Sequence, residues 1–186
     1  HREGRIDQAI VAYQTVLERE PRHAEALQFL GVAKMQTGHS DEAVSFLKQS
    51  VAVHPQNSQA HYNLGMALRA EAKESRALAA FRRAIGVEPR NFEAHNAIAG
   101  ILLAAPDQLK TAEAHIRCAL ESNPNYTPAR NNLALLHKMQ GNSEAALSEA
   151  RAAVAQTPRH VPALTTLGSL LLELGETVEA EKILRD

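Results

Sequence analysis

The chain has 186 residues, with 20 lysines and arginines against 21 aspartates and glutamates, and its formal net charge is −1. This balance argues against a nucleic-acid-binding surface, which requires clustered basic residues, and no apolar run approaches the 18 or so residues of a membrane-spanning helix. The single cysteine, Cys118, excludes an intramolecular disulfide.

Several residue types recur along the chain at nearly constant intervals. Proline stands at Pro21, Pro55, Pro89, Pro124 and Pro158, and alanine at Ala9, Ala43, Ala77, Ala112, Ala146 and Ala180. Small residues stand at Gly31, Gly65, Ala99, Ala134 and Gly168. A period of about 34 residues is typical of solenoids, in which each repeat buries its apolar face against its neighbours.

Residues 24–55 show what each recurring position requires. Leu27, Leu30 and Gly31 have the i, i+3, i+4 spacing of one helix face. Glycine inside a helix costs about 1 kcal/mol relative to alanine, so we expect a second helix to pack closely against Gly31. Pro55 cannot continue that second helix and predicts where it stops. Each repeat is therefore predicted to be a helix, a tight turn, a second helix and a proline stop.

Applied along the chain, this pattern predicts one lone helix followed by five helix pairs. The lone helix is expected near residues 5–19. The pairs are expected near 24–37 with 40–53, 58–71 with 75–87, 92–105 with 109–121, 127–140 with 143–156, and 161–174 with 177–185.

At these positions the chain resembles the tetratricopeptide repeat family, whose signature is W-x2-L-G-x2-Y, then A-x3-F, then P. The L-G pair matches at Leu30-Gly31, Leu64-Gly65 and Leu167-Gly168. The A-x3-F element matches at Ala9 with Tyr13, Ala43 with Leu47, Ala77 with Phe81, Ala112 with Ile116, and Ala180 with Leu184. The resemblance covers essentially the whole chain. It implies an all-α, right-handed superhelical solenoid of antiparallel helix pairs.

The chain departs from the family pattern at three kinds of position. Tryptophan is absent, and the aromatic position near the start of the first helix holds Leu27, His61, His95, Arg130 or Leu164. Ala72 replaces the glycine of one turn, and Pro106-Asp107 replaces that of the next turn and carries an extra residue. We expect these changes to alter local geometry and to leave the fold intact.

We interpret residues 1–186 as a single array of repeats. Residues 1–23 are the second helix of a truncated repeat, complete repeats follow at 24–57, 58–91, 92–126 and 127–160, and 161–186 is a near-complete last repeat. Gly4 is expected in the turn between paired helices, which would make the chain a fragment of a longer protein. We expect that protein to be cytoplasmic.

Repeat arrays need polar terminal caps, and neither end of this chain shows one. Apolar stripes are therefore expected to stay uncovered, with Val11, Leu17, Leu170, Leu174 and Ile183 as candidate members. We expect end-to-end self-association through these terminal repeats.

The sequence contains no clear motif for catalysis or for metal binding. Its nine histidines show no H-E-x-x-H spacing and no accompanying cysteine pair. His61 and His95 share one motif position in successive repeats, but no third metal ligand is evident. Neither a glycine-rich phosphate loop nor a G-x-S-x-G elbow occurs. We therefore expect no metal, no cofactor and no catalytic activity in this segment.

In the resembled family, the first helices of the repeats line a concave groove, and the resemblance implies the same here. The candidate groove residues lie on the first helices, opposite the packing seam: Gln28, Phe29, Val32, Tyr62, Asn63, Met66, Arg69, Asn96, Asn131, Asn132, Leu135 and Lys138. Asparagine is a poor helix former, and its amide can pair with the backbone of any extended ligand. Alternatively, the apolar members pack against the next repeat and the asparagines bond locally.

Two functions fit this pattern. One is a non-catalytic interaction scaffold that binds an extended peptide or partner segment in the groove. The other is the substrate-recruiting arm of a larger enzyme, since the stretches 60–65 and 131–134 resemble the asparagine-lined repeats of O-linked N-acetylglucosamine transferases. The lysine that the family's carboxylate clamp requires is absent, so we do not expect chaperone-tail specificity.

Overall fold

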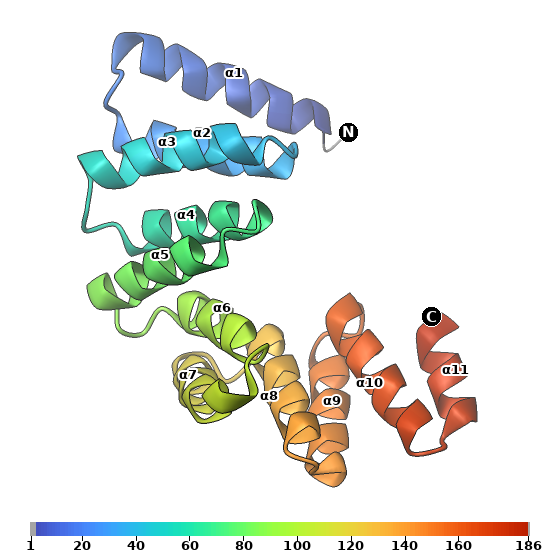
Figure 1. Ribbon diagram of the computed structural model, residues 1–186. Helices are drawn as coiled ribbons and strands as arrows, with labels where there is room; N and C mark the ends of the chain where they lie inside the picture. The colour runs from blue at the N-terminus through green and yellow to red at the C-terminus, as the bar shows by residue number, and fades with distance from the viewer. Residues whose placement is uncertain (1–2, 186) are drawn as a thin grey trace. The chain divides into compact units, whose positions relative to one another are not determined.

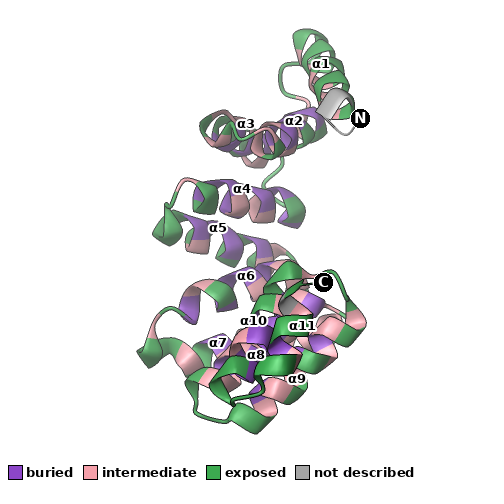
Figure 2. Ribbon diagram, turned by 90° about the vertical axis from the view of Figure 1, so that its right-hand side faces the viewer, coloured by how far each residue is buried: buried purple, intermediate pink, exposed green. Residues whose placement is uncertain are grey.

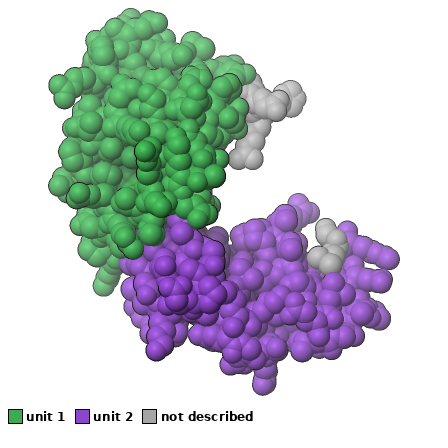
Figure 3. Space-filling model, in the orientation of Figure 1, with its two compact units in different colours: residues 1–94 green, residues 95–186 purple. Residues whose placement is uncertain are grey.

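The computed structural model describes residues 3–185 and leaves residues 1, 2 and 186 undescribed. Between residues 3 and 185 every regular element is helical and no strand occurs (Figure 1), which confirms the predicted fold class. The chain divides into two compact units, residues 1–94 and 95–186 (Figure 3), and each is described by itself. No helix within residues 3–185 is both long enough and apolar enough to cross a membrane.

The first unit contains five helices and the start of a sixth. These are α1 (Glu3–Arg19), α2 (Ala24–Gln36), α3 (Ser40–Val53), α4 (Ser58–Ala70) and α5 (Glu74–Val87). Helix α2 pairs with α3 and α4 pairs with α5, while α1 packs on α2 and α3 packs on α4. The core contains Leu30, Leu47 and Phe81, all without exposed surface, and Figure 2 shows such buried positions in purple.

The second unit contains most of α6 (Phe92–Leu102), the short 3-10 helix η1 (Pro106–Gln108) and five further helices. These are α7 (Leu109–Ser122), α8 (Thr127–Met139), α9 (Ser143–Gln156), α10 (Val161–Glu173) and α11 (Thr177–Arg185). Alanines and leucines of α8 to α11 form its core, among them Ala134, Ala150, Leu167 and Leu171.

Gly31 and Gly65 lie where paired helices come closest. A Cβ atom on Gly31 would lie 2.7 Å from Cγ of Leu47, and a Cβ on Gly65 would lie 2.6 Å from Cδ1 of Phe81. Real Cβ contacts are not this short, so each position requires glycine. The small residue and the large side chain facing it are the partners that the repeated motif predicts.

Four of the turns between paired helices use a left-handed residue. Gly38, Gly141 and Gly175 have φ angles of 82°, 77° and 81°, a region that glycine enters without steric cost. Ala72 takes the same role in the α4–α5 turn with a φ of 56°. Its Cβ makes that conformation unfavourable by about 1–2 kcal/mol, and the surrounding helix pair holds it in place.

Serine hydroxyls tie the first helix to the second in two of the repeats. Ser50 Oγ, at the buried end of α3, donates to the carbonyl of Ala24 at 2.9 Å. In the next repeat the donor and acceptor are exchanged between the helices, because Ser58 Oγ on α4 donates to the carbonyl of Ala84 at 3.1 Å. In each of these two repeats, a serine hydroxyl therefore donates a hydrogen bond to a backbone carbonyl of the paired helix.

The polar residues at the family's aromatic position have a structural role in two repeats. His61 Nε2 donates to the carbonyl of Pro55 at 2.8 Å. Arg130 Nη2 donates to the carbonyl of Pro124 at 3.2 Å, and its Nη1 also pairs with Glu149 at 2.9 Å. Both side chains thus fasten the first helix to the proline stop of the preceding repeat.

The predicted helix bounds agree with the structure except at two places. Helix α6 ends at Leu102, short of the predicted residue 105, because Pro106 follows and Ala105 is extended with φ −117° and ψ 109°. Gly4 lies inside α1, which begins at Glu3, so its prediction as a turn residue between two helices is wrong.

The terminal apolar residues are only partly uncovered. Val11 on α1 is 61% exposed and Leu174 after α10 is 45% exposed, whereas Leu170 is buried at 2%. Ile183 packs against the core of the second unit. Leu170 was therefore wrongly predicted to lie on an uncovered stripe.

Candidate functional site

In the first unit the candidate groove contains an exposed aromatic residue beside a cavity. Phe29 is 47% exposed and stacks on Tyr13 of α1 with a centroid distance of 5.7 Å. A cavity of about 380 Å³ lies between α1 and α2, lined by Tyr13, Phe29, Val32 and also Arg5 and Gln36. An apolar side chain from a partner could contact both rings there.

Two candidate amide side chains of this unit form hydrogen bonds within the protein. Gln28 is buried, and its Oε1 accepts a hydrogen bond from Asn57 Nδ2 at 2.8 Å. Asn63 is 9% exposed, and its Oδ1 accepts from Gln59 Nε2 at 3.3 Å. Asn57 also caps α4 by accepting from the amide of Ala60. The Gln28–Asn57 bond therefore joins two successive repeats, whereas the Asn63–Gln59 bond lies within α4.

Tyr62, Met66 and Arg69 lie along one face of α4. Tyr62 packs its ring on Phe81 at 5.8 Å, and Met66 is half-buried. Burial raises the pKa of the Tyr62 hydroxyl, Glu93 raises it further and Arg69 lowers it in part. Burial and then Glu88 raise the pKa of the Glu93 carboxyl. Tyr62 and Met66 are thus partly buried on this face, whereas Arg69 is exposed.

In the second unit two candidate asparagines bind each other. Asn132 Nδ2 on α8 donates to Oδ1 of Asn96 on α6 at 2.7 Å. Both residues are half-buried. Asn131, one residue earlier, is buried at 6%, and its Oδ1 has no hydrogen-bond partner among the described residues.

Lys138 and Leu135 complete the candidate face of α8. Lys138 Nζ pairs with Glu173 Oε1 at 2.6 Å and contacts Ser169 Oγ at 3.5 Å, both on α10. Leu135 is half-buried. The face therefore presents an apolar residue beside an amide pair and an ion pair.

The structure thus groups the predicted residues in two sets. In the first unit Phe29 and Val32 line one cavity, and Tyr62 and Arg69 are close enough to interact. In the second unit Asn96 and Asn132 are bonded. The sequence analysis missed Tyr13 as part of this surface, although its place in the A-x3-F element put it on the helix that packs against α2.

Several histidines have local structural partners, and those of the described residues form no ligand cluster. Nδ1 of His23 accepts from the amide of Ala26 at the start of α2, and Nδ1 of His160 accepts from that of Ala163 at the start of α10. His95 Nδ1 lies 2.8 Å from His115 Nδ1. Across the described part of the chain, no three histidine, cysteine, aspartate or glutamate side chains gather as a metal site would require.

Comparison with known proteins identifies the repeats. Family models described as tetratricopeptide repeat match residues 1–71, residues 58–91, and residues 75–127 with 131–186. No curated protein matches the sequence with significance.

Several solved structures share the fold. The chain is similar to PilW, described as a widely conserved type IV pilus biogenesis factor, at 18% identity and a TM-score of 0.83, covering 98% of this chain and 84% of PilW. It is similar to a thermophilic tetratricopeptide repeat protein from Thermus thermophilus at 25% identity and a TM-score of 0.73, covering 91% of this chain and 92% of that one. It is also similar to YrrB, described as a tetratricopeptide repeat protein with an unusual peptide-binding site, at 22% identity and a TM-score of 0.65, covering 87% of this chain and 83% of YrrB.

Proposed function

Because the chain belongs to the tetratricopeptide repeat family, we propose that it is a non-catalytic scaffold whose first helices bind an extended segment of a partner protein. The observation that carries this proposal is the exposed Phe29 beside the α1–α2 cavity. Exposed aromatic residues next to pockets are common anchors in protein interfaces.

The roles that we propose for the candidate residues differ with their local contacts. Phe29, Val32 and Met66 are the apolar anchors of the first unit, and Leu135 is that of the second. The half-buried amides of Asn96 and Asn132 can exchange their mutual bond for bonds to a ligand backbone. Asn63 and Asn131 are buried, so their contribution is to position the helices that carry the anchors.

The experiment uses the whole chain and peptides selected against it from a random display library. Replacing Phe29 by glutamine is expected to weaken binding of the selected peptides by about tenfold or more, because loss of a central aromatic anchor commonly costs about 2 kcal/mol or more. Titration calorimetry measures the Kd, and a thermal melt checks that the fold is retained.

A matched control is Gln49→Ala, which changes an exposed residue of the second helix α3. This variant is expected to bind as the unchanged chain does. If Phe29→Gln binds the peptides normally, or if Gln49→Ala weakens them equally, the proposed binding face is wrong.

A further inference from the structure

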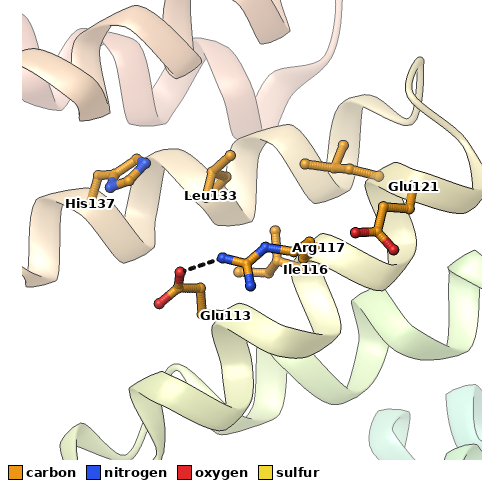
Figure 4. Close-up of a pocket in the computed structure, with 7 residues that line it drawn as sticks. Glu113, Ile116, Arg117, Glu121, Leu133 and His137 are labelled. Atoms are coloured by element: carbon orange, nitrogen blue, oxygen red, sulfur yellow. Dashed lines mark hydrogen bonds and ion pairs between the residues drawn. The ribbon is translucent and has the colours of Figure 1, made fainter.

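A second cavity, unrelated to the candidate groove, lies within the second unit between α7 and α8. Its volume is about 380 Å³, within the range of small ligand sites. Leu120 and Leu133 line it together with the fully buried Ile116, and Glu113, Arg117, Glu121 and His137 supply its polar groups (Figure 4).

The residues at two positions of this cavity differ in type from those at the equivalent positions of other repeats. Seam positions equivalent to Glu113 are Val44 on α3 and Leu147 on α9, and those equivalent to His137 are Leu68 on α4 and Leu171 on α10. Val44, Leu68 and Leu171 are buried, and Leu147 packs on the core of the second unit. Of these three seams, that between α7 and α8 alone has polar residues at both positions.

Only some of the polar groups that line this cavity have hydrogen-bond or ion-pair partners. Arg117 Nη2 pairs with Glu113 Oε1 at 2.8 Å, as the dashed line in Figure 4 shows. Glu121 is exposed and has no ion-pair or hydrogen-bond partner among residues 3–185. His137 Nδ1 is buried and has no hydrogen-bond partner in the described part of the chain. The cavity thus combines an apolar lining with the Glu113–Arg117 ion pair and the unpaired carboxylate of Glu121.

We propose that this cavity binds a lysine side chain of a partner protein. The four-carbon stem lies on Leu120 and Leu133, and the ammonium group binds the carboxylate of Glu121. Lysine suits such a site because it buries its aliphatic stem while its charged head stays at the rim.

The test is an NMR titration of the whole chain with two short peptides, acetyl-Gly-Lys-Gly-amide and the same peptide with norleucine in place of lysine. Norleucine keeps the stem and removes the ammonium group. The lysine peptide is expected to bind about tenfold more tightly, as a hydrogen bond to a charged group commonly contributes about 1.5 kcal/mol or more. The His137 ring and the Leu120 and Leu133 methyl groups report binding.

Three variants test whether the preference for the lysine peptide comes from this cavity or from general electrostatic attraction. Glu121→Gln is expected to abolish the preference for lysine, and His137→Leu to close the cavity and remove binding of both peptides. Glu144→Gln, which changes an exposed carboxylate on α9, is expected to leave the preference unchanged. Equal binding of the two peptides by the unchanged chain, or a preference that survives Glu121→Gln, would overturn the proposal.

Discussion

Replacing Gly65 by leucine is expected to lower the free energy of unfolding by about 3 kcal/mol or more, at or above the upper end of the roughly 1–3 kcal/mol that overpacking a core commonly costs. Even a Cβ atom at this position would lie 2.6 Å from Cδ1 of Phe81. The Phe81 ring is fully buried, so it cannot move aside without displacing its neighbours. A thermal or denaturant melt of the variant measures the loss.

Gly100→Ala is the matched control. Gly100 lies in α6 and is exposed, and a Cβ there would meet Nδ2 of Asn132 at 3.8 Å, an ordinary contact. This variant is expected to keep or raise the melting temperature, because alanine favours a helix over glycine by about 1 kcal/mol. Equal losses for Gly65→Leu and Gly100→Ala would show that the packing seam between α4 and α5 is misplaced.

Replacing Asn91 by alanine is expected to destabilise the chain by about 3 kcal/mol, since the loss of an N-cap and of a buried hydrogen bond act together. Asn91 is 4% exposed, and its Oδ1 accepts from the amide of Ala94 at 2.8 Å at the start of α6. Its Nδ2 donates to Ser58 Oγ at 2.8 Å, and Ser58 in turn donates to the carbonyl of Ala84. Chemical denaturation with urea measures the difference.

Asn142→Ala separates the cap from the buried network. Asn142 caps α9 by accepting from the amide of Ala145 at 3.2 Å in an exposed position. Its loss is expected to cost about 1 kcal/mol, the typical value of a cap. If both asparagine variants lose the same stability, the bond between Asn91 and Ser58 contributes nothing beyond the cap.

The periodicity of the chain predicted the helices well because each repeat carries its own signals. Proline stops, turn glycines and the small residue facing a large one are local features, and the structure has them where they were expected, with Gly4 as the exception. The end of α6 was predicted less well. The extra residue near Pro106 breaks the period, and the pattern of the other repeats could not say where the helix would stop.

The hydrogen-bond partners of the candidate site residues could not be predicted from the sequence of each helix alone. Asn132 and Asn96 are 36 positions apart, and Gln28 and Asn57 are 29 apart, so their bonds depend on how successive repeats stack. The helical period of a single helix shows only which face an amide lies on, so it cannot show that the amide is bonded to a neighbouring repeat. The α7–α8 cavity, by contrast, could have been suspected from the sequence, since His137 stands where three other repeats have Leu68, Leu102 and Leu171.

The most direct test of the binding face is photo-crosslinking of a display-selected peptide to the whole chain, followed by mass spectrometry of the crosslinked residues. The account predicts crosslinks to residues of the first helices, with Phe29, Val32, Met66 and Leu135 foremost, and none to the exposed faces of α3, α5 or α9. Crosslinks concentrated on those second helices, with Phe29 and Met66 unmodified, would contradict it.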